Sequence, residues 1–536
     1  MVSGQFTQNG SDLRDLSPPR LVKPQRLAAS KNGMISTQHY LATDAGAAIL
    51  AEGGNAVDAA VAAALALCVC EPAACGLGGQ TMALIHLAHT RRSFAVDGSS
   101  RAPNQTFARA LSEESRRYGY RATTVPSTPA VLSYILERYG TMKLSRVIGP
   151  AVSLAEQGYQ VSELQRRLTR RVRKHLRNGP AGPLFLKEGR KTYRAGEHFA
   201  QPVLANTLRR LADAGAEDFY TGRIAEMIHR DMVINNGLIR REDLAQIPWP
   251  IERKPVACSV DNLRVLTFPP PGAGRTLVEM LNIVSCFPPK YRNPDNCEGA
   301  VLLSKAIQQA NRDRRDRPYE PDFYAQVAQK QMLSIDYAKS VARACRKQIR
   351  TAGETTHLSV MDRYGNVVAL TQSIERVYGA CVATPQLGFL YNNYMSAFED
   401  EDIGHPCYLR PNASPWASVA PTIILKNRKP WLAIGSPGSE RITSSILQVL
   451  LRLRNQSPLE AVAAPRLHCS AGGTVSLEAS RMRSDILESL ERHGFNVDVR
   501  DPYSFYLGCV QLVLRDDTTF IGVADPRRDG SAGGPR

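Results

Sequence analysis

Residues 353–361 read G-E-T-T-H-L-S-V-M, and this short segment holds a residue that could carry covalent chemistry. If the chain were cut between Glu354 and Thr355, Thr355 would begin a new chain and could act as a nucleophile. The alternative is an ordinary strand that starts after a turn, because threonine favours strands and glycine marks turns. The nine residues alone leave both interpretations open.

The sequence that follows Thr355 predicts a β-hairpin that brings a second hydroxyl toward it. Apolar residues on both sides of a D-R-Y-G-N segment are typical of two strands joined by a turn. Pairing Met361 with Asn366 places Thr355 opposite Gln372, one position from Ser373, and a slip of one residue stays open. We therefore expect the Ser373 hydroxyl within reach of Thr355, although a serine at a strand end can also make only a local hydrogen bond.

A third chemical feature is the loop G-S-P-G-S at 435–439, which precedes a helical segment. Backbone N–H groups in such a loop can point into one concavity, where the helix N-terminus helps to bind negative charge. A simple helix-capping turn is the alternative interpretation of the same residues.

The elements that must position these groups alternate between helices and strands, which predicts an α/β fold. Apolar spacing, cap residues and turn residues mark their ends. Helices are expected near 43–52, 56–70, through much of 130–230, and at 276–284, 299–317 and 442–453; strands are expected near 81–88, 91–100, 263–268, 356–361, 367–373, 420–427 and 430–435. The charged stretch 322–354 is interpreted as a linker or processing region. This layout suits strands stacked between helical layers.

The chain has 536 residues, of which 43% are hydrophobic, enough for a large core or for two closely packed lobes. No run approaches the roughly 18 apolar residues of a membrane helix. Residues 1–30 are polar and lack the apolar centre of a signal peptide, so we expect a loose arm and a cytoplasmic protein. The eleven irregularly spaced cysteines agree with reduced thiols. No C-x-x-C pair or histidine cluster points to a metal, and we expect no cofactor.

The formal net charge is +17, and much of the excess lies in arginine-rich patches such as Gln165–Arg177. A basic patch can bind nucleic acid, or it can be the solvated face of a helix or pair with acidic residues elsewhere. No aromatic residues that could stack on bases alternate with these arginines. We therefore expect neither a nucleic-acid nor a membrane partner.

Several of these stretches, taken together, resemble the γ-glutamyltransferases. The motifs GGNAVDAAVAAALAL, GLGG, TTHLSVMDRYGNVVALTQS, NNYMSAF and APTIIL…IGSPGSERI occur in the family's order between about residues 33 and 525. The resemblance implies the four-layer αββα fold of the N-terminal-nucleophile hydrolases. It also implies self-cleavage before Thr355 into 1–354 and 355–536, with 31–354 as the large subunit after the arm and 355–536 as the small subunit. The two fragments are expected to stay associated as a heterodimer, and a higher oligomer is also possible.

The resemblance also implies roles for the residues above. Before the cut, the Thr355 hydroxyl attacks the Glu354 carbonyl, and the ester that forms is hydrolysed. The cut frees an α-amine with a pKa of about 8, which can then serve as the base for the same hydroxyl. Ser373 stands where the family usually has the threonine that supports the nucleophile. The amides of Gly438 and Ser439 form the oxyanion hole, with Ser439 in place of the usual glycine.

The residues that hold a glutamyl group in the family are largely replaced in this chain. The departures are Ser99 for an arginine, Glu375 for an asparagine, Tyr394 for a glutamine or glutamate, Ala397 for an aspartate and Ala417 for a serine. Ser418 keeps the second serine of the family's pair. Losing the arginine removes a charge-assisted hydrogen bond from the substrate carboxylate. Arg101 and Arg376 are the two candidates for its replacement, each with a surface role as the alternative.

We therefore expect an amidohydrolase that uses the family's catalytic groups on a different acyl group of a small amide. Glu375 could still hold an amine, and Tyr394 would narrow the pocket. Relatives with altered pockets include oxamate amidohydrolase and the glutaryl-type cephalosporin acylases, and the loss of the amine-binding set favours an oxamate-type amide. The alternatives are a genuine γ-glutamyltransferase, or glutathione hydrolase, with a different clamp, and a non-catalytic scaffold or basic nucleic-acid binder.

Overall fold

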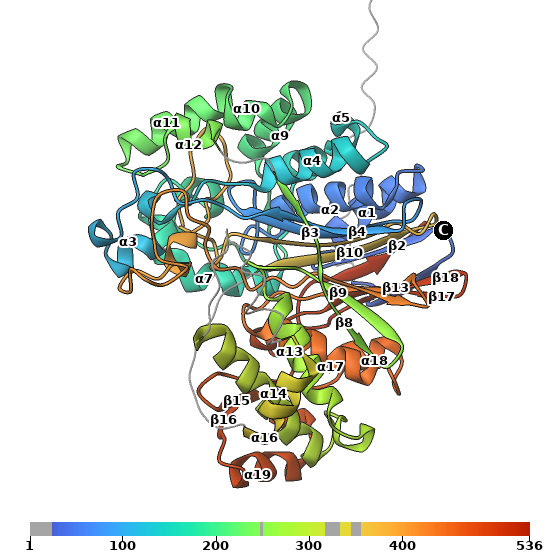
Figure 1. Cartoon of the computed structure of the whole chain (residues 1–536). Helices are drawn as coiled ribbons and strands as arrows, with labels where there is room; N and C mark the ends of the chain where they lie inside the picture. Colours follow the sequence, from blue (N-terminus) through green and yellow to red (C-terminus); the bar gives the residue numbers. More distant parts are fainter. Residues whose placement is uncertain (1–23, 247–249, 317–332, 345–354, 536) are drawn as a thin grey trace, which may run out of the picture.

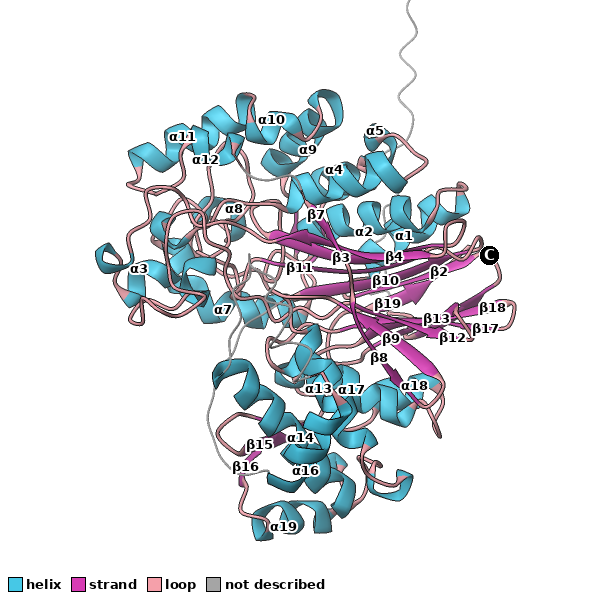
Figure 2. Ribbon diagram, in the orientation of Figure 1, coloured by secondary structure: helices cyan, strands magenta, loops and turns pink. Residues whose placement is uncertain are grey.

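Two seven-stranded β-sheets lie face to face in the middle of the molecule, and helices cover the outer face of each (Figures 1 and 2). This computed structural model describes residues 24–246, 250–316, 333–344 and 355–535. The layer order is helix, sheet, sheet, helix, so the predicted four-layer αββα architecture is confirmed. Among the described residues, no helix has the length and apolar character needed to cross a membrane.

The first sheet contains the strand that follows Thr355. Its order is β19 (Ser531–Gly533), β2 (Gly33–Thr37), β10 (Thr356–Asp362), β11 (Val367–Ser373), β3 (Gln80–Leu87), β4 (Arg92–Gly98) and β7 (Ile251–Arg253). The order in the second sheet is β1 (Leu27–Ser30), β18 (Thr519–Ala524), β17 (Gln511–Asp516), β13 (Lys429–Gly435), β12 (Thr422–Lys426), β9 (Leu263–Thr267) and β8 (Val256–Val260). Neighbouring strands in both sheets pair antiparallel.

Helices with apolar faces cover the two sheets. On the side of the first sheet are α1 (Tyr40–Ala51), α2 (Ala56–Cys70), α4 (Thr128–Tyr139), α5 (Leu144–Val147), α6 (Gly149–Gln157) and α9 (Pro202–Ala214). On the side of the second sheet are α13 (Gly274–Ser285), α14 (Cys297–Asp316), α16 (Ile335–Ala344), α17 (Arg441–Arg452), α18 (Pro458–Ala463) and α19 (Ser484–Arg492). The remaining elements are α3 (Glu113–Arg117), α7 (Glu163–Arg177), α8 (Gly182–Phe185), α10 (Glu217–Tyr220), α11 (Arg223–Ile234), α12 (Arg241–Ala245), β5 (Tyr159–Gln160), β6 (His198–Phe199), β14 (Leu467–Cys469), β15 (Thr474–Leu477) and β16 (Asn496–Val499).

Helix α2 forms because its start is capped and its small side chains allow close packing. The Asn55 side chain accepts hydrogen bonds from the N–H groups of Val57 and Asp58, and the Asp58 carboxylate accepts one from the Asn55 N–H. This reciprocal capping box satisfies donors that would otherwise lack partners. Every residue of α2 is buried, and α2 packs against α1 and the first sheet.

Two expectations about the chain termini and the linker need correction. The loose arm predicted for 1–30 is wrong at its C-terminal end, because Leu27–Ser30 forms edge strand β1, in which Leu27 pairs with Val523 of β18. Gln25 and Arg26 are also held there, since their carbonyls accept hydrogen bonds from the N–H groups of Ala532 and Ala524. Residues 1–23 and Glu354 lie outside the described part of the chain. Within the stretch interpreted as a linker, Ile335–Ala344 forms helix α16, which contacts α13.

The basic segment at 165–177 lies within helix α7. The helix buries Leu168, Thr169, Val172 and Leu176 along one side, and the residues between them, mostly arginines, face outward. This is the pattern of an amphipathic surface helix. It agrees with the interpretation of a solvated basic face.

His357 packs across the space between the two sheets. Its imidazole hydrogen-bonds to the hydroxyls of Thr371 (Nδ1, 2.8 Å) and Ser359 (Nε2, 3.1 Å), and burial lowers its pKa to about 3, so the ring is neutral at physiological pH. A Cβ atom added to Gly435 of β13 would lie only 2.2 Å from the ring. Gly435 therefore allows the strand after Thr355 to approach the loop that follows β13.

The Gly435→Ala substitution is expected to destabilise the protein by about 1–3 kcal/mol, because a buried ring or a strand must shift. Urea unfolding followed by circular dichroism measures the effect. The control is Gly149→Ala at the start of α6, where the nearest atom to an added Cβ is 4.0 Å away. Equal stability of the two variants would contradict the tight packing between His357 and Gly435.

Candidate active site

Thr355 directly precedes β10 at the open end of the hairpin, opposite the turn, and 5% of its surface is exposed. The predicted register is wrong by one residue: Met361 pairs with Val367, and Thr356 pairs with Gln372. The turn is longer than expected because the Asp362 carboxylate accepts hydrogen bonds from the backbone N–H groups of residues 364 and 366. Continuing this register by one residue brings Thr355 opposite Ser373.

Ser373 is the last residue of β11 and is 1% exposed. Its hydroxyl accepts a hydrogen bond from the Glu375 N–H (2.9 Å). The Ser373 side chain also lies beside the buried phenol of Tyr394. Burial raises the pKa of Tyr394, and its hydrogen bonds to Ser373 and Gln80 lower this pKa in part. Tyr394 thus packs directly behind the serine predicted to support the nucleophile.

The loop between β13 and α17 turns through two residues with positive φ. Gly438 (φ +119°) and Ser439 (φ +54°) both have left-handed backbone conformations. The carbonyls of these two residues accept hydrogen bonds from Arg441 and Ile442, which form the first turn of the helix. Among the described residues, neither the Gly438 N–H nor the Ser439 N–H donates to a protein acceptor. Two adjacent backbone donors are therefore available to a ligand.

A cavity of about 490 Å³ begins at this loop. It is lined by Asn311, Arg314, Arg315, Glu375, Arg376, Ser396, Ala397, Phe398, Glu399, His405, Trp416, Ser418, Ser439 and Glu440. The cavity thus brings together predicted site residues from three stretches of the sequence: Glu375 with Arg376, Ser418, and Ser439. A larger cavity of about 650 Å³ is lined by Asp295 and residues 455–486 and contains none of the predicted site residues.

Arg101, one of the two proposed replacements for the missing arginine, points elsewhere. Its guanidinium donates to the backbone carbonyl of Asn412 (3.2 Å), and Arg101 is not among the residues that line the cavity. Arg376 does line it, and its backbone N–H donates to the Asn393 side chain. Glu375 has φ +74°, an uncommon conformation for a side-chain-bearing residue, at the cavity wall.

The structure adds a cation that the sequence did not single out. Arg314, near the end of α14, donates from Nη2 to the Ser418 hydroxyl (3.1 Å) and to the Ala417 carbonyl (3.2 Å). Its guanidinium carbon lies 5.1 Å from the centre of the Trp416 ring, within cation–π range. Arg314 therefore lies beside the one serine that the family's carboxylate-binding pair retains. Among the described residues, no group of three or more His, Cys, Asp or Glu side chains is arranged to hold a metal ion.

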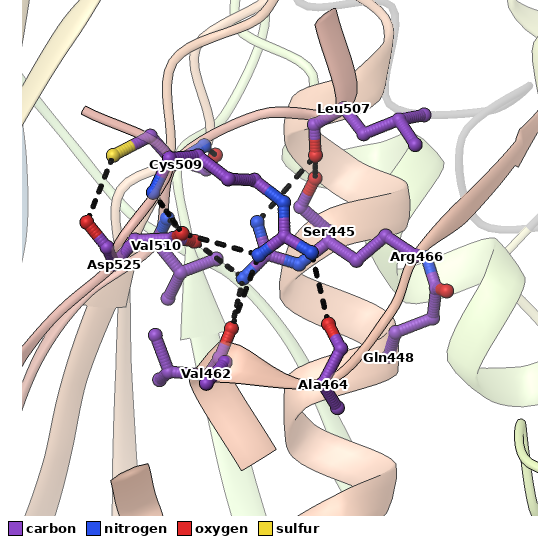
Figure 3. A network of polar contacts seen from close by, with 12 residues as sticks. Ser445, Gln448, Val462, Ala464, Arg466, Leu507, Cys509, Val510 and Asp525 are labelled. Atoms are coloured by element: carbon purple, nitrogen blue, oxygen red, sulfur yellow. Dashed lines mark hydrogen bonds and ion pairs between the residues drawn. The ribbon is translucent and has the colours of Figure 1, made fainter. Parts of the chain in front are cut away.

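A buried network of polar contacts surrounds Arg466 and Asp525 (Figure 3). Arg466 pairs with Asp525 (2.5 Å), and Arg527 pairs with both Asp525 (3.1 Å) and Glu478 (2.7 Å). The Asp525 carboxylate also accepts a hydrogen bond from the N–H of Val510 (2.8 Å). One residue before Val510, the Cys509 N–H donates to Ser436 Oγ (2.9 Å) within the 435–439 loop. The network therefore fixes the segment against which the loop rests.

The Asp525→Asn substitution is expected to destabilise the protein by about 3–5 kcal/mol at neutral pH, because it leaves buried arginine charge without its partner. Burial alone would raise the pKa of Asp525, but Arg466 and Arg527 outweigh it and hold the pKa below its ordinary value. The Asp525 carboxylate therefore contributes stability above its unfolded pKa of about 3.9, and this is lost as the pH falls through the folded value.

Denaturant unfolding at several pH values measures this contribution. The matched control is Asp517→Asn in the exposed turn between β17 and β18. A destabilisation by Asp525→Asn no larger than that of the control would show that the network does not support the loop.

The fold and this site define the class of protein. The fold consists of two stacked antiparallel sheets between helical layers, and Thr355 directly precedes a strand inside the first sheet. His357 of that strand packs against Gly435, at the start of the loop after β13. These are the features of an N-terminal-nucleophile hydrolase. A family model described as gamma-glutamyltranspeptidase matches residues 42–534. The chain therefore belongs to the gamma-glutamyltranspeptidase family, as its motifs predicted, and is an enzyme that acts on amide bonds.

Relatives of two kinds are similar to this chain. It is 31% identical to the glutathione hydrolase proenzyme of Escherichia coli (strain K12), covering 93% of this chain and 91% of the relative. It is 33% identical to the acylase ACY 1 proenzyme of Pseudomonas sp. (strain V22), covering 94% of each. The cephalosporin acylase from Bacillus halodurans has a similar structure, with a TM-score of 0.87, 28% identity, and coverage of 98% of this chain and 100% of that one.

Proposed function

We propose that this protein is a self-processing amidohydrolase with Thr355 as its nucleophile, and that its preferred acyl group lacks the α-amine of a γ-glutamyl group. The observation that carries the proposal is the pairing of β10 with β11, which brings Thr355 opposite Ser373. Glu375, two residues after Ser373, lines the same cavity as Ser439. The contact between His357 and Gly435 links the nucleophile strand to the loop, because each residue lies two or three positions from the proposed reacting groups.

Maturation would begin with attack of the Thr355 hydroxyl on the Glu354 carbonyl. The backbone nitrogen of Thr355 leaves, an ester forms between Glu354 and the Thr355 side chain, and water hydrolyses it. The products are a carboxylate on Glu354 and a free α-amine on Thr355. The two fragments, 1–354 and 355–536, would remain associated as a heterodimer, because strands from both lie side by side in each sheet.

In turnover, the α-amine of Thr355 takes the proton of the Thr355 hydroxyl as that oxygen attacks the substrate carbonyl. The N–H groups of Gly438 and Ser439 would hold the negative oxygen of the tetrahedral intermediate, and one such donor typically contributes about 3 kcal/mol. The intermediate expels the amine, which receives the proton, and leaves an acyl ester on Thr355. Water then hydrolyses the ester and regenerates the enzyme.

The cavity supports an acyl group that ends in a carboxylate. Arg314 and Ser418 offer a cation and a hydroxyl side by side, which suits a carboxylate. Ala397 offers no charge to an α-amine, and the position of the family's glutamine or glutamate is filled by Tyr394, which is buried against Ser373. A carboxylate-bearing acyl group without an amine matches this combination. Oxamate is the smallest candidate of this kind.

A genuine γ-glutamyltransferase is the second candidate, because Glu375 lines the cavity and could pair with an amine. Hydrolysis, in which water accepts the acyl group, is proposed over transfer, because transfer needs a second site that recognises an amino-acid acceptor. A cytoplasmic location also stays a proposal. It rests on the eleven irregularly spaced cysteines, which agree with reduced thiols.

Four anilides that share a leaving group would test the acyl preference. The γ-glutamyl anilide differs from the glutaryl anilide only by its α-amine, from the 4-aminobutyryl anilide only by its carboxylate, and from the butyryl anilide by both. We expect the highest kcat/KM for the glutaryl anilide and a lower value for each compound without the carboxylate, with oxamate assayed in parallel by ammonia release. Faster Thr355-dependent hydrolysis of the γ-glutamyl anilide than of the glutaryl anilide would reject the proposed preference.

A further inference from the structure

The peptide unit between Thr355 and Thr356 is held from behind by buried polar side chains that the proposed chemistry does not use. Arg528, close to the C-terminus, donates from Nη1 to the Thr355 carbonyl oxygen (3.1 Å). The same nitrogen lies 3.2 Å from Gln38 Oε1 and 3.4 Å from Glu71 Oε1. The Arg528 side chain is only 1% exposed. A guanidinium in this position has few alternative conformations.

Glu71 completes the arrangement from the other side. It directly follows α2, and its Oε2 accepts a hydrogen bond from the Thr356 hydroxyl (2.5 Å). The Arg528–Glu71 ion pair therefore contacts both residues that share the peptide unit. The Phe505 ring lies 4.1 Å from the guanidinium carbon of Arg528 and closes the remaining side.

We propose that Arg528, anchored by Glu71 and Gln38, is a positioning residue that fixes the Thr355 carbonyl and thereby aims the amine and hydroxyl of Thr355. This inference rests on the proposed function, because it requires Thr355 to be the nucleophile. The amine, the carbonyl and the hydroxyl-bearing Cβ all branch from one Cα atom. A charge-assisted hydrogen bond to the carbonyl therefore restricts where the other two groups point.

A second effect of Arg528 is electrostatic. Its positive charge, bonded to the carbonyl of the same residue, disfavours protonation of the Thr355 amine and so favours the form that acts as a base. Glu71 opposes this effect when it is ionised. The two charges should therefore shift the pKa of the Thr355 amine in opposite directions. A residue with a purely structural role would not shift this pKa.

The groups around Glu71 determine whether its carboxylate is ionised, and so whether it opposes Arg528, near neutral pH. Burial raises the pKa of Glu71 to about 7, although Arg528 and the Thr356 hydroxyl lower it in part, and Asp529 raises it further. Burial raises the pKa of the neighbouring Cys70 thiol well above its ordinary value, so the thiol is neutral. Burial lowers the pKa of His39, on the same small cavity, to about 4, so this imidazole is also neutral at pH 7.

The test compares Arg528→Gln, Arg528→Lys and Glu71→Gln with wild type. The control is Arg26→Gln, because Arg26 Nη1 also donates to carbonyls of the same C-terminal segment, at Asp525 (2.9 Å) and Gly530 (2.6 Å). Each variant is made as the full chain, to follow self-cleavage. Each is also made as two co-expressed fragments, with an initiator methionine before Thr355 that the host's methionine aminopeptidase removes. Activity can then be measured even if maturation fails.

We expect Arg528→Gln to slow self-cleavage and to lower kcat on the glutaryl anilide by about 100-fold with little change in KM, because misplacing a reacting group by about 1 Å has this effect. Arg528→Lys should recover part of the loss. The acidic limb of the kcat/KM profile should move to higher pH in Arg528→Gln and to lower pH in Glu71→Gln. Arg26→Gln should stay within about threefold of wild type.

Two results would overturn the inference about Arg528 but not the proposed function, provided that the wild-type protein is still cleaved and acylated at Thr355. One is an Arg528→Gln variant with unchanged kcat and an unchanged pH profile. The other is an equal loss in Arg26→Gln, which would assign the effect to a loosened C-terminal segment. A wild-type protein that neither cleaves nor forms an adduct on Thr355 would instead reject the proposed function, and the inference with it.

Discussion

Replacing Thr355 with alanine is expected to leave one uncut chain of 536 residues and to abolish amide hydrolysis. The same hydroxyl is proposed to attack both the Glu354 carbonyl and the substrate, and alanine removes it while leaving the strand pairing of β10 with β11 intact. Loss of a nucleophile that acts with its base as one unit typically lowers kcat by about 10⁴-fold or more. Gel electrophoresis and anilide hydrolysis measure the two effects.

Two further variants make this result specific. Thr355→Ser keeps a hydroxyl and should retain self-cleavage and measurable turnover. Thr519→Ala, at the first residue of β18, removes a threonine hydroxyl 164 positions after Thr355 and should match wild type. An alanine variant at 355 that is still cut before that position, or that still turns over at the wild-type rate, would rule out Thr355 as the nucleophile.

Replacing Arg314 with glutamine is expected to lower kcat/KM for the glutaryl anilide by about 10- to 100-fold and to leave the butyryl anilide nearly unchanged. The guanidinium lies beside Ser418 at the cavity wall, where it can bind the substrate carboxylate. A hydrogen bond to a charged group contributes about 1.5–3 kcal/mol, which corresponds to a change of this size. The ratio of the two substrates separates loss of carboxylate binding from general damage.

Arg315→Gln is the matched comparison, because it removes the same charge from the next position on α14, at the same cavity. It should lower the glutaryl rate by a smaller factor than Arg314→Gln. Equal losses on the glutaryl and butyryl anilides in Arg314→Gln would show that Arg314 supports the fold of the site and does not recognise the carboxylate.

Features that depend on neighbouring residues were predictable from the sequence. The helix at 56–70 and the hairpin around Asp362 are set by residues a few positions apart, and the structure contains both. The hairpin register was off by one because the Asp362 side chain bonds to two backbone N–H groups and lengthens the turn. Strand β1 was missed because it has four residues and its partner β18 lies near the other end of the chain.

The site was predictable where one motif carried the information. The turn at Gly438 and Ser439 has positive φ at both residues, and their role in an oxyanion hole stays a prediction. The position of Ser373 opposite Thr355 follows from the hairpin. Arg314 and Arg528 were missed because their contacts join positions 104 and 173 residues apart. Such pairs depend on how the layers stack, and no local pattern in one sequence encodes that.

Intact-mass spectrometry of the purified protein, with and without the glutaryl anilide, tests the central claim most directly. We predict two fragments, the smaller beginning at Thr355, and a transient increase in the mass of that fragment by one glutaryl group, located on Thr355 by peptide mapping. A single uncut chain, or an acyl group on any residue other than Thr355, would contradict the proposal that this threonine is both the product of self-cleavage and the nucleophile.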